Sequence, residues 1–204
     1  MNLIFDLDGT LIDSRSRLYH LFQRLAPSSR LSYEEYWELK RNRISNETIL
    51  KSHLNYGNEA ITNFTSDWMT LIESAEFLEM DVNFPGMRDT LSHLKEHADL
   101  HVCTDRQSRQ PVLDQLDRLN LLPFFSQILV TLQKDRKEDL IVAHVPNRSR
   151  GDWILGDTGR DIQVGKRLGI RTCAVLSGFL SRKSLLDYAP DLILDAVTNF
   201  SLDS

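Results

Sequence analysis

Short apolar segments recur along the chain, and most of them lie beyond residue 85. Each is rich in Val, Ile or Leu, which is the pattern of buried β-strands. Apolar residues at helical spacing lie between these segments, for example at Met87, Leu91 and Leu94. This alternation predicts a mainly parallel sheet with helices on both faces. The predicted strands are 3–5, 100–104, 128–131, Trp153–Gly156, 172–176 and Leu192–Leu194.

Residues 15 to about 80 follow a different pattern. They contain no convincing strand, and their apolar residues recur at helical spacing in three stretches, near 18–25, 32–39 and 64–75. Pro85-Gly86 then marks the return to the alternating region. The sequence therefore predicts an α/β core with a helical domain inserted after the first strand. The expected boundaries are 1–14 and 81–204 for the core and 15–80 for the insert.

The composition excludes several classes of protein. The chain has 204 residues, 41% of them hydrophobic, and a net charge of −5. That charge argues against a nucleic-acid binder that relies on a broad basic face. The N-terminal run lacks a basic region and contains acids, unlike a signal peptide, and no apolar stretch is long enough to cross a membrane. We therefore expect a cytoplasmic protein that binds neither nucleic acid nor membrane.

The segment Asp6-Leu7-Asp8-Gly9-Thr10 carries the strongest chemical signal. Asp6 and Asp8 are two residues apart at the end of the first predicted strand, so their side chains should point to the same side. Placing two carboxylates together is electrostatically costly, and a divalent cation offsets that cost. Gly9 permits a sharp turn directly after them. Two solvated acids at the end of a strand would give the same sequence pattern. A second acidic segment downstream favours the metal site over this alternative.

That second segment is Gly156-Asp157-Thr158-Gly159-Arg160-Asp161, which follows a predicted strand. Parallel α/β sheets bind ligands at the carboxyl ends of their strands. Asp157 lies at such an end and is the better candidate for a metal ligand. Asp161 could serve equally as a helix N-cap.

The order and spacing of these segments resemble those of the haloacid dehalogenase (HAD) superfamily, on its phosphatase side. Asp6-Leu7-Asp8-Gly9-Thr10 matches the first family motif, Thr104 matches the second, and the segment starting at Gly156 matches the fourth. Pro85-Gly86-Met87 resembles the re-entry from a helical cap. The resemblance implies a Rossmann-like core with a cap of the phosphoglycolate-phosphatase type.

The resemblance also implies a mechanism. Asp6 would attack phosphorus and form an aspartyl phosphate, and Asp8 would protonate the leaving oxygen and later activate water. Mg²⁺ would bind an Asp6 carboxylate oxygen, the Asp8 backbone carbonyl, Asp157 and the substrate phosphate. The phosphoryl oxygens would be bound by the Thr104 hydroxyl and by backbone N–H groups at Gly9, Thr10 and Asp105.

Family members also carry a lysine that neutralises charge on the nucleophile and the phosphoryl group. Lys134 and Lys137 are the two candidates here. Lys137 directly precedes an apparent helix start, which fixes the backbone and allows a long side chain to be aimed reproducibly. Lys134 lies in a loop with no evident restraint. We therefore predict that Lys137 is the active-site lysine, which would also contact the substrate.

The predicted insert contains a basic cluster at Lys40, Arg41 and Arg43. Such a cluster is more often a solvated helix end than an anion-binding patch. Both interpretations stay open at this stage.

Hydrolysis of a small phosphorylated metabolite is the leading function. A phosphomutase of the β-phosphoglucomutase type would use the same Asp6 and Asp8, and the cap decides whether water or a sugar hydroxyl accepts the phosphoryl group. A dehalogenase is disfavoured because Asp8 would have no evident role. A non-catalytic binding protein of this fold is less favoured because no core acid is missing. The substrate's identity and the oligomeric state stay open.

Overall fold

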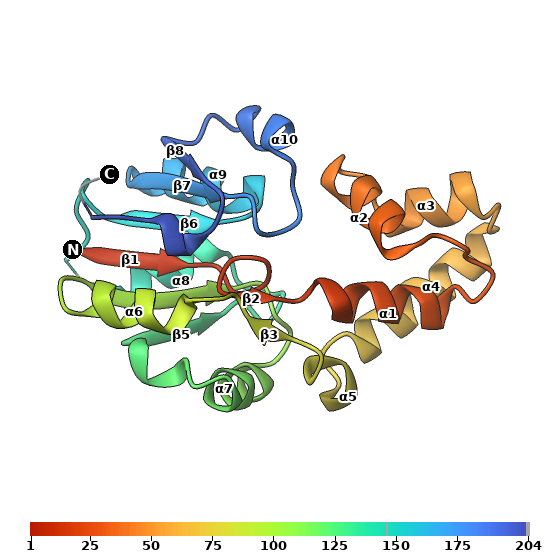
Figure 1. The fold of residues 1–204 in the computed structure, drawn as a ribbon, viewed down its shortest axis with the longest axis horizontal. Coiled ribbons are helices and arrows are strands. Elements are labelled where there is room, and N and C mark those ends of the chain that lie inside the picture. Colours follow the sequence, from red (N-terminus) through yellow and green to blue (C-terminus); the bar gives the residue numbers. More distant parts are fainter. Residues whose placement is uncertain (146, 203–204) are drawn as a thin grey trace.

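A six-stranded parallel sheet forms the centre of the protein, which we describe from a computed structural model covering residues 1–145 and 147–202. The strand order is β5-β4-β1-β6-β7-β8, and every pairing is parallel (Figure 1). The strands are β1 (Asn2–Phe5), β4 (Asp99–Thr104), β5 (Gln127–Val130), β6 (Trp153–Gly156), β7 (Arg171–Val175) and β8 (Leu192–Leu194). Each coincides with a strand predicted from an apolar run, so the α/β, Rossmann-like core is confirmed.

Helices cover both faces of this sheet. Leu3 and Phe5 of β1 pack on one face with residues of α6 (Met87–Lys95) and α7 (Arg109–Arg118). Ile4 points to the opposite face, where it packs with residues of α8 (Lys137–His144) and α9 (Gly159–Leu168). Strands that are buried on both sides read as continuous apolar runs, which is why the sequence pattern identified them.

The strand order places β1 in the middle of the sheet, between β4 and β6. Asp6 directly follows β1, Thr104 ends β4, and Asp157 directly follows β6. Because parallel strands end at the same edge, these three residues come together in the crevice where chain connections leave in opposite directions. The fold therefore concentrates the predicted motifs at one edge.

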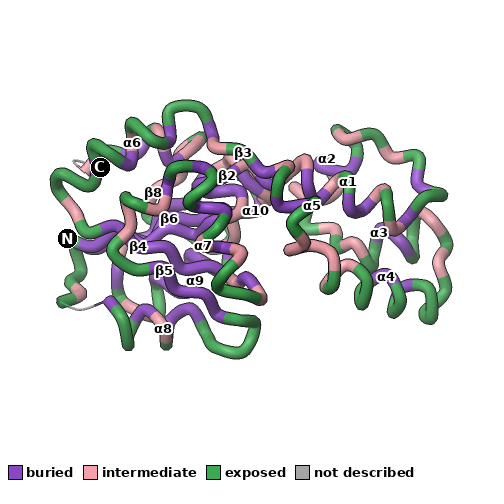
Figure 2. Tube along the Cα trace, turned by 90° about the horizontal axis from the view of Figure 1, so that it is seen from below, coloured by how far each residue is buried: buried purple, intermediate pink, exposed green. Residues whose placement is uncertain are grey.

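A block of helices stands beyond this edge of the sheet (Figure 1). It begins after β2 (Ile12–Asp13) and ends before β3 (Val82–Asn83), and these two short strands pair antiparallel at its base. Its own apolar core centres on Phe22, Tyr36 and Phe64, and is visible as a separate buried stretch in Figure 2. The helices of the block are α1 (Arg15–Leu25), α2 (Tyr33–Arg41), α3 (Asn46–His53), α4 (Asn58–Leu71) and α5 (Ala75–Leu78).

Several elements were not predicted. The sequence pattern predicted one long apolar stripe at helical spacing from 64 to 75. In the structure, α4 ends at Leu71 and the short helix α5 starts after its N-cap Ser74. The helix α3 and the β2–β3 pair were also missed, as were α10 (Arg182–Leu186), η1 (Leu122–Phe124) and η2 (Val197–Asn199). The two short strands, α10, η1 and η2 have two to five residues each, and α3 buries only the adjacent pair Ile49 and Leu50, so none shows a repeated apolar period. Within the described part of the chain, no helix has the length and apolar character needed to span a membrane.

Truncating Phe22 tests the separate core of the helical block. Its side chain is fully buried, and its ring lies 4.8 Å from that of Tyr36 and 5.9 Å from that of Phe64. We expect Phe22→Ala to lower the free energy of unfolding by about 3–5 kcal/mol, as measured by urea denaturation. Val142→Ala, at an exposed position of α8, serves as the control and should change it by less than about 0.5 kcal/mol. Equal effects of the two substitutions would contradict this packing.

Candidate active site

Lys137 links two carboxylates at the carboxyl edge of the sheet. Its Nζ lies 2.6 Å from Oδ1 of Asp6 and 2.7 Å from Oδ1 of Asp161. Lys137 is the first residue of α8 and is buried, whereas Lys134 is exposed in the preceding turn. The structure thus brings Lys137, and not Lys134, to the predicted nucleophile.

The pKa values in this cluster reflect burial opposed by ion pairing. Burial disfavours the Lys137 ammonium, but Asp161 and Asp6 outweigh it and raise the lysine pKa well above its ordinary value. Burial raises the pKa of Asp6 to about 7, with Lys137 acting in the opposite direction and Asp161 in the same direction.

Asp157 completes a group of three buried acids. Ligand oxygens of Asp6, Asp157 and Asp161 all lie within 4.8 Å of one another. Oδ2 of Asp157 accepts the Phe179 backbone N–H at 2.7 Å, and Oδ1 accepts the Thr10 hydroxyl at 3.3 Å. Burial, then the neighbouring Asp6 and Asp161, raise the pKa of Asp157 well above its usual range.

The donor set fits a hard divalent cation. Three carboxylates are buried together with only the Lys137 ammonium bridging two of them, so the site has an excess of negative charge. Carboxylate oxygens are the preferred ligands of Mg²⁺. Asp161 belongs to the capping box of α9, where its Oδ2 accepts the Thr158 hydroxyl at 2.7 Å. Asp6 and Asp157 stand at the ends of β1 and β6 and are the candidates for metal ligands. A second group of possible ligands, His93, Glu96 and His97, is exposed on and just beyond α6.

Glycines bring the backbone against Asp157. A Cβ atom on Gly178 would lie 2.0 Å from Oδ2 of Asp157, and one on Gly9 would lie 2.6 Å from the same oxygen. Gly9 also has a φ of +77°, a conformation that favours glycine. The Ser177 hydroxyl donates to the Gly9 carbonyl at 2.8 Å. The segment after β7 thus closes on the first motif and fixes the Asp157 carboxylate.

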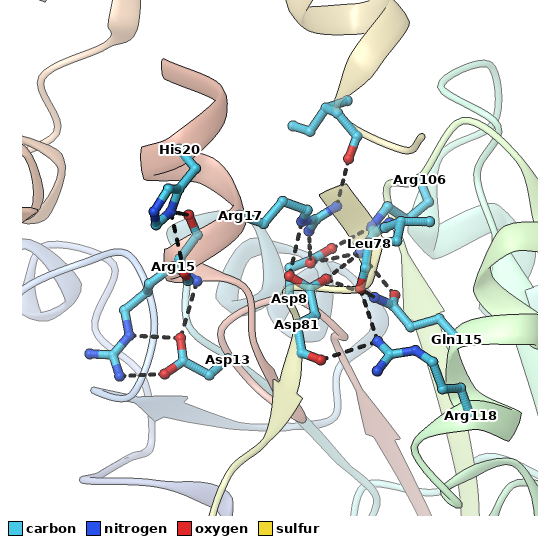
Figure 3. A network of polar contacts seen from close by, with 12 residues as sticks. Asp8, Asp13, Arg15, Arg17, His20, Leu78, Asp81, Arg106, Gln115 and Arg118 are labelled. Carbon is cyan, nitrogen blue, oxygen red and sulfur yellow. Dashed lines mark hydrogen bonds and ion pairs between the residues drawn. The ribbon is translucent and has the colours of Figure 1, made fainter. Parts of the chain in front are cut away.

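Two arginines hold Asp8 (Figure 3). Arg106 is bidentate, with Nε 2.6 Å from Oδ2 and Nη2 2.8 Å from Oδ1, and Arg17 donates to Oδ1 as well. Both arginines are buried. Burial favours the neutral form of Asp8, but Arg106 and Arg17 outweigh it and hold the pKa of this carboxyl well below its usual range. Asp8 therefore faces away from the acidic cluster into a network of cations.

Asp81 lies behind these arginines at zero exposure. Nε of Arg17 is 3.1 Å from its Oδ1, and the Gln115 side-chain amide donates to its Oδ2 at 2.7 Å. The Gln115 carbonyl oxygen in turn accepts from Arg106 at 3.2 Å. Burial raises the pKa of Asp81 to about 6, with Arg17 acting in the opposite direction and Asp8 in the same direction. The network joins α1 of the helical block and α7 of the core through Asp81, which lies between α5 and β3.

The other predicted phosphate-binding residues lie around the same edge. Thr104 is buried at the end of β4, beside Val130 of β5. The hydroxyl of Thr10 is directed to Asp157 rather than to open space. Asp105 is half-buried and forms an ion pair with Arg160, with 2.6 Å between its Oδ2 and the arginine Nε. The structure thus gathers all the predicted site residues at one edge.

The basic cluster of the helical block has mixed roles. The Arg43 guanidinium pairs with Asp187 at 3.0 Å and lies over the Tyr188 ring, so it attaches the block to the core. The Arg41 carbonyl accepts the Ser181 N–H at 3.2 Å. Burial lowers the pKa of Lys40 to about 8, and its ammonium contacts the Asn46 side chain. Arg43 is exposed just past the end of α2, as expected for a solvated helix end, and it also contacts the core.

Sequence reasoning missed Arg17, Arg106 and Asp81. Arg106 follows Thr104 by two residues, a position close to a predicted motif that could have drawn attention to it. Arg17 lies among the apolar residues of α1 and is 1% exposed, although arginine is seldom fully buried without a partner. Neither the sequence of α1 nor the loop sequence after β4 indicates which acid Arg17 or Arg106 contacts.

The fold and site define a parallel α/β protein with a cluster of buried carboxylates at the carboxyl edge of its sheet, and the family comparison adds the reaction class. Residues 3–175 match the model of the haloacid dehalogenase-like hydrolases. The chain belongs to this family, which confirms the resemblance in its sequence. It is an enzyme, a HAD-type hydrolase with curated relatives that are phosphatases.

One such relative is a phosphoglycolate phosphatase from Synechococcus elongatus. It is 26% identical over 205 residues, which cover 95% of this chain and 92% of that protein. Among solved structures, the haloacid dehalogenase-like protein SP0104 from Streptococcus pneumoniae has a TM-score of 0.76 at 22% identity, covering 96% of this chain and 94% of its own. The HAD hydrolase YfnB from Bacillus subtilis, bound to magnesium, has a TM-score of 0.67 at 18% identity, with coverage of 96% and 94%.

Metal binding can be tested at Asp157 without measuring catalysis. Asp157→Asn keeps the shape of the side chain but removes one negative charge from the cluster. We expect the dissociation constant of Mn²⁺, measured by electron paramagnetic resonance, to rise by about tenfold or more. Asp117→Asn, on the exposed side of α7, is the charge-matched control and should leave it unchanged. Equal Mn²⁺ affinities in the two variants would remove Asp157 from the metal site.

Proposed function

We propose that this protein is a Mg²⁺-dependent phosphohydrolase that cleaves small phosphomonoesters through an aspartyl phosphate on Asp6. The observation that carries the proposal is the ion pair of Asp6 with Lys137 at the end of the central strand, next to Asp157. A carboxylate that is buried, held in position and beside a cation is suited to in-line attack on phosphorus. The phosphatase names of curated relatives support the same reaction class.

Asp6 and Asp157 would hold the metal ion, together with the Asp8 backbone carbonyl. Bound there, Mg²⁺ would supply positive charge that offsets the carboxylates and the phosphoryl oxygens. Lys137 would neutralise charge on Asp6 and on the phosphoryl group, because its ammonium already contacts the nucleophile. The Thr104 hydroxyl would donate to a phosphoryl oxygen from the neighbouring strand end.

The reaction would proceed in two steps. In the first, an Asp6 oxygen bonds to phosphorus, the ester P–O bond breaks, and a proton from Asp8 neutralises the leaving oxygen. In the second, water attacks the aspartyl phosphate, Asp8 accepts its proton, and the P–O bond to Asp6 breaks. The contacts of Asp8 with Arg17 and Arg106 suit the second step, since they stabilise an ionised base. Proton donation in the first step would require these contacts to loosen.

We also propose that residues 15–80 act as a cap. The Trp37 ring of α2 lies 5.5 Å from the ring of Phe179, whose backbone N–H holds Asp157. Arg17 of α1 reaches Asp8, so a movement of the block would change a contact of the acid–base residue. A cover at the strand ends excludes water and limits the size of the substrate.

Asp6→Asn tests the nucleophile. Asparagine preserves the shape but cannot form the phosphoenzyme, so we expect kcat for 4-nitrophenyl phosphate in Mg²⁺ to fall roughly 10³-fold or more. An unchanged circular dichroism spectrum would show that the fold is retained. Activity above a tenth of the wild-type value would exclude Asp6 as the nucleophile.

A pair of lysine variants tests the assignment of Lys137 as the active-site lysine. Lys137→Ala removes an ammonium 2.6 Å from Asp6, and Lys134→Ala removes an exposed one of the same charge. We expect kcat/KM to fall by about 10²–10³ for Lys137→Ala, the effect of one preorganised donor, and to change less than about threefold for Lys134→Ala. The reverse order would move the catalytic role to Lys134.

A further inference from the structure

A cavity of about 220 Å³ lies between Asp8 and the helical block. Asp8, Arg17 and Arg106 border it on the core side, and the end of α4 borders it on the other. Because Asp8 is the residue expected to serve the leaving oxygen, this cavity is where the rest of the substrate would lie. Its volume corresponds to about seven water molecules at roughly 30 Å³ each, which fits a small leaving group.

The two arginines in this wall have no charge to spare for a ligand. Arg17 uses its three nitrogens on Asp8, Asp81 and the Ile72 carbonyl. Arg106 is bidentate on Asp8 and lies 3.6 Å from Asp81 (Figure 3). Its Nη1 has no hydrogen-bond partner among the described residues, but the charge of the guanidinium is already matched by Asp8 and Asp81. Two guanidiniums therefore face two carboxylates, and this part of the wall is neutral.

Glu73 makes the wall negative. Its Oε1 accepts the Gln107 backbone N–H at 2.7 Å, while its buried Oε2 has no hydrogen-bond partner within the described chain. None of the ion pairs found among described residues involves Glu73. A buried carboxylate oxygen without a donor is costly, and because Glu73 lines the cavity, a ligand that donates a hydrogen bond would remove that cost.

Most of the remaining wall is apolar and consists of Leu18, Trp68, Met69, Ile72 and Phe179. Asp105 and Gln133 also line the cavity, and the Asp105 carboxylate is paired with Arg160. The apolar side chains suit a short carbon skeleton and give no compensation to a buried anion.

We propose that this cavity, with Glu73 as its specificity-determining residue, selects phosphomonoesters whose leaving group is cationic or neutral and donates a hydrogen bond. Leaving groups that carry a second anion, such as a carboxylate, are discriminated against. The inference rests on the proposed function. It separates this chain from its relative named phosphoglycolate phosphatase, since glycolate would bring a carboxylate toward Glu73.

Phosphoethanolamine and phosphoglycolate form a matched pair for the test, because their leaving groups are of similar size and opposite charge. For the wild-type enzyme in Mg²⁺, we expect kcat/KM to be about tenfold or more higher for phosphoethanolamine. Glu73→Gln keeps the Oε1 acceptor but removes the charge, so KM for phosphoethanolamine should rise about tenfold with little change in kcat. The ratio of kcat/KM for phosphoethanolamine to that for phosphoglycolate should fall by a similar factor. Glu79→Gln, at an exposed glutamate that directly follows α5, is the control. It should change neither the KM for phosphoethanolamine nor the preference over phosphoglycolate.

Binding to the Asp6→Asn protein separates this inference from the proposed function. Calorimetric titration of both ligands in Mg²⁺ should give tighter binding of phosphoethanolamine, and the Glu73→Gln substitution in this background should remove the difference. Equal or tighter binding of phosphoglycolate would overturn the inference, even if 4-nitrophenyl phosphate is hydrolysed. The expected binding order without turnover of any ester would instead uphold the inference and refute the hydrolase mechanism.

Discussion

The crowding of carboxylates at one edge of the sheet is the constraint on which the site depends. Asp6, Asp157 and Asp161 are buried within a few ångströms of one another, and Asp8 lies two residues from Asp6. Removing one partner of a buried pair leaves an uncompensated charge, which is strongly destabilising. The fold meets this constraint with three buried cations, Lys137, Arg17 and Arg106, that come from separate parts of the chain. The acids are therefore divided into two sets, each with its own cations.

This division gives the two motif acids different surroundings. Asp6 shares a single lysine with Asp161 and lies beside Asp157, so its set keeps an excess of negative charge that suits a divalent cation. Asp8 meets two arginines and has no such excess. A spacing of two residues is thus enough to give the two carboxylates different partners, as the proposed roles of Asp6 in attack and Asp8 in proton transfer require. Different environments for paired acids are a general route to separate catalytic roles.

The parts predicted from sequence are those that depend on local pattern. The six core strands are continuous apolar runs, and Asp6 and Asp157 follow two of them, so the sheet edge could be inferred from the chain alone. The position of Lys137 also followed from a local cue, the start of α8. Arg106 could not be assigned in this way, because its partner Asp8 is 98 residues away. The same holds for Gly178, whose need for a bare backbone arises only when Asp157 packs against it.

The helical block and the reactive groups form one connected arrangement. Arg17 of α1 binds Asp8 and also donates to the Ile72 carbonyl just after α4, so the two ends of the block meet at Asp8. On the opposite side, Trp37 of α2 contacts Phe179, and the Phe179 backbone holds Asp157. A displacement of the block would therefore alter the contacts of Asp8 and those near Asp157 at the same time. In the proposed mechanism, the same few contacts between the block and the sheet edge would therefore govern the size and charge of the leaving group and the positions of Asp8 and Asp157.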